Sequence, residues 1–235
     1  SKLHKNMAEY NSDANTSLLL HCNGADGTNT FTDSSGTPKD VTAIGDAQID
    51  TAKSKFGGAS GLFDGTGDYL TTPSHADFDI SGSDYTKEAW VYVPSTVSVD
   101  APIMARRPAG QPNGWLFFVQ YPDGYLHYSG YINGAWTDPI MRDTSLFPKD
   151  KWTHAAITRS GVDAKMFVDG TLVDMATITT IQDSSGSAFV VGTNASNGEG
   201  SMNGWIDEVR FSKGVARWTA NFTPDPSFVP KVIIY

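Results

Sequence analysis

Tight-turn dipeptides divide this chain into short segments, and they constrain its fold more than any other feature. Asn-Gly and Asp-Gly pairs readily supply the positive φ angles that two-residue β-hairpin turns require. The clearest predicted hairpin joins residues 164–168 to residues 171–173 across Asp169-Gly170. The nine such pairs are Asn23-Gly24, Asp26-Gly27, Asp64-Gly65, Asn113-Gly114, Asp123-Gly124, Asn133-Gly134, Asp169-Gly170, Asn197-Gly198 and Asn203-Gly204.

The composition favours strands over helices. With 23 Gly and 12 Pro, the chain holds no long stretch of apolar residues at helical spacing. Its 235 residues, 39% of them hydrophobic, are enough to bury one large core. Many short strands separated by turns predict an all-β fold, an antiparallel jelly-roll β-sandwich formed by a single domain.

A series of short strings, in a fixed order, carries a family resemblance. They are residues 18–24 (LLLHCNG), 55–60 (KFGGAS), 63–70 (FDGTGDYL), 85–91 (YTKEAWV), 152–156 (WTHAA), 167–173 (FVDGTLV), 207–210 (DEVR) and 215–218 (VARW). The series resembles the laminin G-like, concanavalin A-like lectin/glucanase jelly-roll family, from about Ser17 to Pro224. Its motifs are also similar to domains found in tailed-phage and large-virus particle proteins.

The resemblance implies a non-catalytic binding or structural module. We expect a component at the virion surface, either an adhesin for host glycans or a decoration subunit that contacts other capsid or tail subunits. The alternatives are a carbohydrate-binding domain of a bacterial surface or extracellular protein and, less favoured, a glycan-degrading enzyme. The fold alone does not decide, because it serves many functions.

The two ends are expected to differ from the domain between them. Residues 1–16 are polar and are expected to form an arm or to be a remnant of cloning, with the jelly roll at 17–225. Residues 226–235 form an apolar tail of strong β-propensity. We expect the tail to lie on its own domain as a last strand, or to be lent to a neighbouring subunit of a homo-oligomer.

Charge and hydropathy exclude some partners. The net charge of −9 argues against nucleic acid, because phosphate binding needs a basic surface. No apolar run approaches the 18 residues of a membrane span, so we expect no membrane insertion. Cys22 is the only cysteine, which excludes an internal disulfide bond.

A carboxylate in an apolar strand suggests a metal. The period of two predicts Asp207 on the same face as Trp205, Val209 and Phe211, where a charge needs compensation. The resemblance implies calcium, a cation that prefers oxygen ligands. The ligands it implies are Asn23, Asp64, Gly65 and Asp207. Alternatively, Asp207 caps a turn or pairs with an arginine.

Aromatic residues beside polar ones suggest a sugar site, since aromatic faces stack on the apolar face of a pyranose. Glu88, Trp90 and Tyr92 share a strand parity opposite apolar neighbours, and are predicted to form a solvent-facing lane. Tyr128 and Trp136 are further candidates. The alternative is that these aromatic residues belong to the core.

Hydrolysis of glycans needs two carboxylates that face each other across a cleft. No Glu-x-Asp-x-x-Glu string occurs, Glu88 is the only acidic residue of its strand, and Asp207 and Glu208 are predicted to point to opposite faces. His154 is expected to be a buried structural residue rather than a base. The sequence therefore predicts a protein that is not an enzyme.

Overall fold

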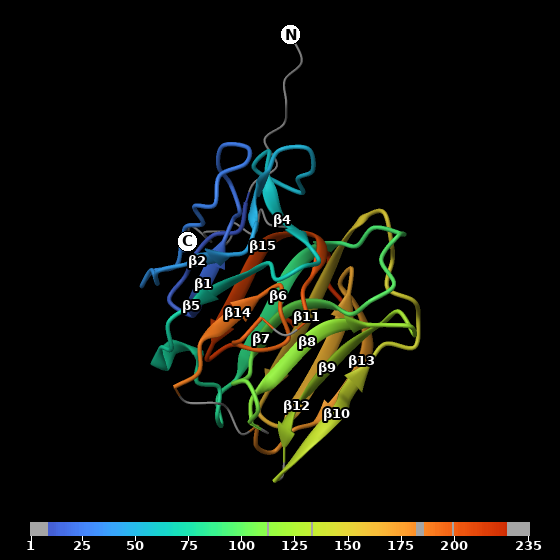
Figure 1. Cartoon of the computed structure of the whole chain (residues 1–235). Helices are drawn as coiled ribbons and strands as arrows, with labels where there is room; N and C mark the ends of the chain where they lie inside the picture. Colours follow the sequence, from blue (N-terminus) through green and yellow to red (C-terminus); the bar gives the residue numbers. More distant parts are fainter. Residues whose placement is uncertain (1–8, 112, 133, 182–185, 199, 225–235) are drawn as a thin grey trace, which may run out of the picture.

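The chain folds as a β-sandwich of two antiparallel sheets (Figure 1). The computed structural model describes residues 9–111, 113–132, 134–181, 186–198 and 200–224. The two antiparallel sheets confirm the predicted fold class, an all-β sandwich. The predicted apolar tail, 226–235, and the first eight residues of the predicted arm lie outside the described residues.

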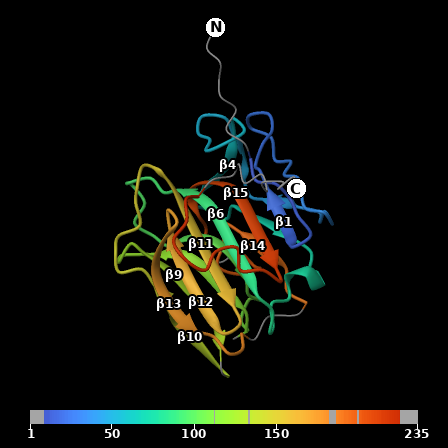
Figure 2. The same ribbon diagram turned by 180° about the vertical axis from the view of Figure 1, so that it is seen from behind.

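The first sheet, seen in front in Figure 2, has eight strands in the order β13-β12-β11-β6-β15-β4-β3, with β1 also paired to β15. The strands are β13 (Thr171–Thr177), β12 (Asp163–Val168), β11 (Trp152–Ser160), β6 (Tyr85–Tyr92), β15 (Asn203–Lys213), β4 (Ser60–Asp64), β3 (Gln48–Asp50) and β1 (Thr16–Leu20). The hairpin predicted at Asp169-Gly170 joins β12 to β13, and Asp169 has the positive φ, 47°, that the turn requires.

The second sheet has seven strands in the order β10-β9-β8-β7-β14-β5-β2. They are β10 (Ala135–Arg142), β9 (Tyr125–Ile132), β8 (Trp115–Gln120), β7 (Ala101–Arg106), β14 (Phe189–Val191), β5 (Tyr69–Thr72) and β2 (Thr42–Ile44), and a 3-10 turn, η1 (Ala76–Phe78), follows β5. Within the described part of the chain, no helix is long and apolar enough to cross a membrane.

The hydrophobic core lies between the sheets and follows strand alternation. On β6, Tyr85, Ala89 and Val91 face the core, while Glu88 and Trp90 point to the outer face of the first sheet. The outer face of β6 is thus the face on which three of the predicted ligand-binding residues, Glu88, Trp90 and Tyr92, lie.

A β-bulge at Glu208 changes the parity of β15. Glu208 has φ of 51°, and the pairing of β15 with β6 shifts between Asp207 and Arg210. Ile206 and Phe211 therefore both face the core although five positions separate them. Asp207 shares its face with Trp205 as predicted, but the predicted grouping with Val209 and Phe211 is wrong: Asp207 lies opposite Trp90 on the outer face, whereas Val209 and Phe211 are in the core.

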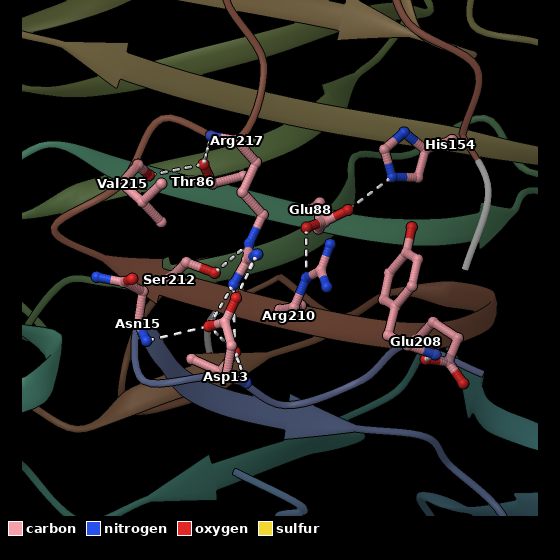
Figure 3. Close-up of polar contacts among 12 residues, drawn as sticks. Asp13, Asn15, Thr86, Glu88, His154, Glu208, Arg210, Ser212, Val215 and Arg217 are labelled. Atoms are coloured by element: carbon pink, nitrogen blue, oxygen red, sulfur yellow. Dashed lines mark hydrogen bonds and ion pairs between the residues drawn. The ribbon is translucent and has the colours of Figure 1, made fainter. Parts of the chain in front are cut away.

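Two segments from opposite ends of the described chain cover part of this outer face (Figures 2 and 3). Residues 9–15, which were predicted to belong to an arm, pack on the sheet, with Tyr10 buried against Trp90. Residues 214–222 cross it on the other side, where Thr158 Oγ1 donates to the Trp218 carbonyl. The segments are joined by Arg217, whose guanidinium donates two 2.9 Å bonds to Asp13.

Candidate functional site

Glu88 does not face solvent as predicted. It is fully buried beneath the two covering segments, where its carboxylate accepts a 2.7 Å bond from Arg210 Nε and lies 3.1 Å from His154 Nε2 (Figure 3). Burial alone would raise the pKa of Glu88, but Arg210 and His154 outweigh it and lower the pKa to about 2. Glu88 is therefore part of a closed ionic network and is not available to a ligand.

Trp90 is also buried rather than exposed. Tyr10, Leu19 and Phe56 surround it in a small apolar cluster on the outer face. The ring of Phe56 meets that of Trp90 edge to face at 5.8 Å, and Lys55 Nζ lies 3.9 Å from the Trp90 centroid. Glu88 and Trp90, two of the three residues predicted to form a solvent-facing lane, are therefore buried.

Two further predicted ligand-binding residues, Tyr128 and Trp136, lie on the second sheet, apart from Glu88 and Trp90. Tyr128 is completely buried in the core, where its hydroxyl accepts a 2.6 Å bond from Lys87 Nζ. Trp136 is partly exposed on the outer face of the second sheet, with the Arg107 guanidinium 4.8 Å from its ring. The five predicted ligand-binding residues therefore do not form one site, and three of them are inaccessible.

Tyr92, by contrast, is partly exposed and stands in the middle of a row of aromatic side chains. Trp152 on β11 and Trp205 on β15 are its direct cross-strand partners, so all three rings project from the outer face at one level of the sheet. The ring centroids of Trp152 and Tyr92 are 5.8 Å apart, and those of Tyr92 and Trp205 are 5.5 Å apart. We refer to Trp152, Tyr92 and Trp205 as the aromatic row.

Polar groups fix the aromatic row at one end. Trp205 Nε1 donates a 2.6 Å hydrogen bond to Asp50 on β3, which holds the indole over β4. Lys53 Nζ lies 4.3 Å from the Tyr92 centroid and 5.0 Å from that of Trp205. Partly exposed aromatic rings beside polar groups that can hydrogen-bond to hydroxyls are what a sugar-binding surface requires.

The loop that carries Lys53 is anchored by Asp207. Asp207 Oδ2 accepts hydrogen bonds from the backbone N–H groups of Lys55 (2.8 Å) and Phe56 (3.0 Å). Ser60 Oγ donates to the Lys53 carbonyl at 2.8 Å. Burial raises the pKa of Asp207 to about 7, and the neighbouring Glu208 adds to the increase. The carboxyl that was predicted to bind an ion therefore positions the edge of the aromatic row.

The predicted calcium ligands do not come together. Asp207 Oδ1 accepts from the Glu208 N–H, so both oxygens of this carboxylate already bind backbone donors. Asp64 and the adjacent Gly65 lie near Asn203, four residues before Asp207 on β15, a separation of about 13 Å along a strand. Asn23 donates to Glu9 instead. These residues, as placed, do not fit a single calcium coordination sphere.

Asp207 and Glu208 were predicted to point to opposite faces, and the bulge at Glu208 makes this prediction wrong. Glu208 lies on the outer face with Asp207 and not on the opposite one. The evidence is that its Oε2 accepts a 3.0 Å hydrogen bond from the N–H of Tyr10, which packs on that face. His21 Nδ1 lies 2.9 Å from Glu208 Oε1. Both carboxylates are completely buried beneath covering segments.

Trp152 and Trp205 were not among the predicted ligand-binding residues. Trp152 belongs to a family string, and strand parity suggested that Trp205 was a core residue. The signal that could have found them is cross-strand pairing: both tryptophans lie directly opposite Tyr92, so their side chains point to the same face of the sheet as that of Tyr92. Strand parity becomes useful only once the strand pairing is known.

A profile of the concanavalin A-like lectin/glucanases superfamily matches residues 64–219, more than half of the 235 residues. The chain belongs to this superfamily. A comparison with curated protein sequences finds no match. All three members of the aromatic row lie within the matched region, with Tyr92 in its first third, Trp152 near its middle and Trp205 near its end.

Solved structures share the fold at low sequence identity. Domain 4 of AbnA, an extracellular GH43 arabinanase from Geobacillus stearothermophilus in complex with arabinotriose, is 20% identical with a TM-score of 0.65, over 86% of this chain and 93% of that domain. The binding domain of Paraclostridial Mosquitocidal Protein 1 is 18% identical with a TM-score of 0.63, over 86% of this chain and 49% of that one. The binding domain of botulinum neurotoxin serotype D is 16% identical with a TM-score of 0.61, over 84% and 48%. The chain spans about half the length of the two toxin domains.

Proposed function

We propose that this chain is a non-catalytic glycan-binding module in which the aromatic row is the sugar-binding surface. The observation that carries the proposal is the cross-strand alignment of Trp152, Tyr92 and Trp205 on three adjacent strands of a rigid sheet. A row on paired strands holds its rings at fixed spacing, so little conformational entropy is lost when a ligand binds.

The chemistry of the row suits a sugar better than a protein partner. Aromatic rings pack against the C–H faces of sugars, and the carboxylate of Asp50 can accept hydrogen bonds from hydroxyl groups. Two structural relatives support this class of ligand, because the Geobacillus domain was solved with arabinotriose and the binding domain of botulinum neurotoxin DC with SialylT.

The acidic residues of the outer face support binding without hydrolysis. Glu88, with a pKa of about 2 and an ion pair to Arg210, cannot act as a proton donor near neutral pH. Asp207 and Glu208 are covered by residues 55–56 and by Tyr10. None of these three carboxylates faces another across an open cleft, as glycoside hydrolysis requires.

We further propose that the module acts at the surface of a virus particle, as an adhesin for host glycans. The support is the resemblance of its motif series to phage and large-virus particle proteins. A carbohydrate-binding domain of a bacterial extracellular protein is the alternative. Self-association through residues 226–235 would add avidity to a single shallow site.

The test is a glycan-binding screen of the wild-type chain, followed by titration of the best binder against Tyr92→Ala and Trp152→Ala. We expect each substitution to weaken binding at least tenfold, which corresponds to about 1.4 kcal/mol. Trp136→Ala is the matched control, because Trp136 is a partly exposed aromatic residue on the other sheet. Loss of binding in Trp136→Ala alone would move the site to the second sheet, and release of reducing ends by the wild type would refute a non-catalytic module.

A further inference from the structure

A polar hollow of about 550 Å³ lies on the first sheet beyond Trp205. Its volume is within the range of small-ligand sites. It is formed by β3 and β4 at the edge of the sheet and by three loop segments, residues 27–30, residues 45–47 and Asp68, and we refer to it as the acidic hollow. Its polar and charged lining includes Asn29, Asp46, Gln48, Asp64 and Asp68.

The acidic hollow adjoins the aromatic row in strand register. Trp205 on β15 lies directly opposite Leu62 on β4, and Leu62 lies directly opposite Gln48 on β3. Leu62 and Gln48 are both partly exposed and both line the hollow. The two features are therefore parts of one strip that crosses five adjacent strands, from Trp152 to Gln48.

The length of the strip sets the size of ligand that can fill it. Four strand spacings separate β11 from β3, which gives about 19 Å at roughly 4.8 Å per spacing. A sugar unit, built from bonds of about 1.5 Å, adds roughly 5 Å to an extended chain. An oligosaccharide of about four units would span the strip, whereas one or two units would cover only one end.

The charge of the acidic hollow limits the chemistry of that ligand. Asp46, Asp64 and Asp68 line it, and no Lys or Arg is among its lining residues in the described chain. Asp68 accepts from the backbone N–H groups of Asp46 (2.6 Å) and Asp64 (2.8 Å). Asp68 is itself buried. Together with the amides of Asn29 and Gln48, the exposed carboxylates of Asp46 and Asp64 can form hydrogen bonds with hydroxyl groups. They would repel a carboxylated sugar.

We propose that the acidic hollow is a second subsite of the glycan-binding strip and that it selects linear, uncharged oligosaccharides of about four units. One end of the chain stacks on the aromatic row, and the other end places its hydroxyl groups against Asp64 and Gln48. This inference rests on the proposed function and adds the length and the charge of the ligand.

The test uses calorimetric titration of neutral oligosaccharide ladders of one to six units, from the arabinan, glucan and xylan series, and a galacturonan ladder as the anionic comparison. We expect affinity to increase up to about four units and then to level off, with the anionic ladder at least tenfold weaker at equal length. Affinity that does not change beyond one or two units, or a preference for galacturonan, would overturn the subsite alone. Failure of every ladder and every screened glycan to bind would overturn the proposed function as well.

Variants separate the two parts of the strip. Asp64→Asn keeps the side-chain oxygen that accepts from the Thr66 N–H, and Gln48→Ala removes one amide. We expect each to weaken four-unit binding at least fivefold while leaving two-unit binding and the melting temperature unchanged. Asp163→Asn, an exposed carboxylate on β12, is the control and should change neither. Unchanged four-unit binding in both hollow variants would contradict the proposal.

Discussion

The ammonium group of Lys53 lies over the ring of Tyr92, 4.3 Å from its centroid. The same group is 5.0 Å from the ring of Trp205, so one cation covers part of two rings of the aromatic row. Since Lys53 is held by a loop whose backbone is bound to Asp207 and Ser60, the cover is positioned by the fold and is not a chance surface contact.

Removal of this cover should make the row more accessible. A sugar that stacks on Tyr92 has to displace the Lys53 ammonium, and a cation–π contact at an exposed site is worth about 0.5–1 kcal/mol. We therefore expect Lys53→Ala to tighten glycan binding about two- to fivefold in calorimetric titration. Lys151→Ala, which removes a nearby exposed ammonium, is the control. Weaker binding in Lys53→Ala would show instead that Lys53 contacts the ligand directly.

Asp207 should make stability depend on pH. Its pKa is raised from 3.8 to about 7 in the folded chain, so between these values the folded state binds more protons than the unfolded state. The contribution of Asp207 to the free energy of unfolding should therefore fall as pH rises from about 4 to 7, whereas Glu88, whose pKa Arg210 and His154 lower to about 2, contributes an increase at the acidic end of this range. Asp207→Asn should remove the Asp207 contribution, so the difference in free energy of unfolding between wild type and variant should shrink as pH rises in urea unfolding measured from pH 4 to 8. A smaller loss of stability should remain in the variant at the upper end of that range, because Glu208 outweighs burial and raises the pKa of His21 in the folded chain. A variant with the wild-type slope would show that Asp207 is ionised throughout.

The buried ion pair beneath the covering segments should be sensitive to the loss of one partner. Arg210→Met leaves the completely buried Glu88 carboxylate without its cation, which typically costs about 3–5 kcal/mol. Lys151→Ala, in an exposed pair with Asp169, should change the free energy of unfolding by less than about 1 kcal/mol. Denaturant unfolding of both variants gives the comparison. Equal effects would mean that water reaches Glu88 in solution.

Calcium should have little effect on the stability of this chain, because Asp207 already accepts three backbone hydrogen bonds and Asp64 lies far along the sheet. We expect thermal melts in excess calcium and in chelator to coincide. A higher melting temperature in calcium that disappears in Asp207→Asn would restore the ion site implied by the family resemblance.

The fold could be predicted from the sequence because its signals are local. The turn at Asp169-Gly170 needs a particular backbone conformation, and alternation on β6 places Ala89 and Val91 in the core. The bulge at Glu208 could not be predicted in this way, since a non-glycine residue with positive φ gives no sequence signal. One extra residue there placed Asp207 on the face opposite Val209 and Phe211.

The site was predicted only in part, for a different reason. Parity placed Glu88, Trp90 and Tyr92 together on the outer face, but it could not show that Tyr10 and Phe56 cover Trp90. These contacts join residues far apart in the chain. Tyr92 stays accessible because it is at the end of its strand, beyond the covering residues, and its partners Trp152 and Trp205 are defined by strand pairing alone.

The most direct test of the account is to locate a bound glycan by nuclear magnetic resonance. The indole N–H signals of the six tryptophans serve as reporters during titration with the best-binding glycan of the screen. We predict that the signals of Trp152 and Trp205 shift in proportion to occupancy, while that of Trp115, which is completely buried in the core, stays in place. Saturable shifts at Trp136 with none at Trp152 or Trp205 would contradict the aromatic row as the binding site.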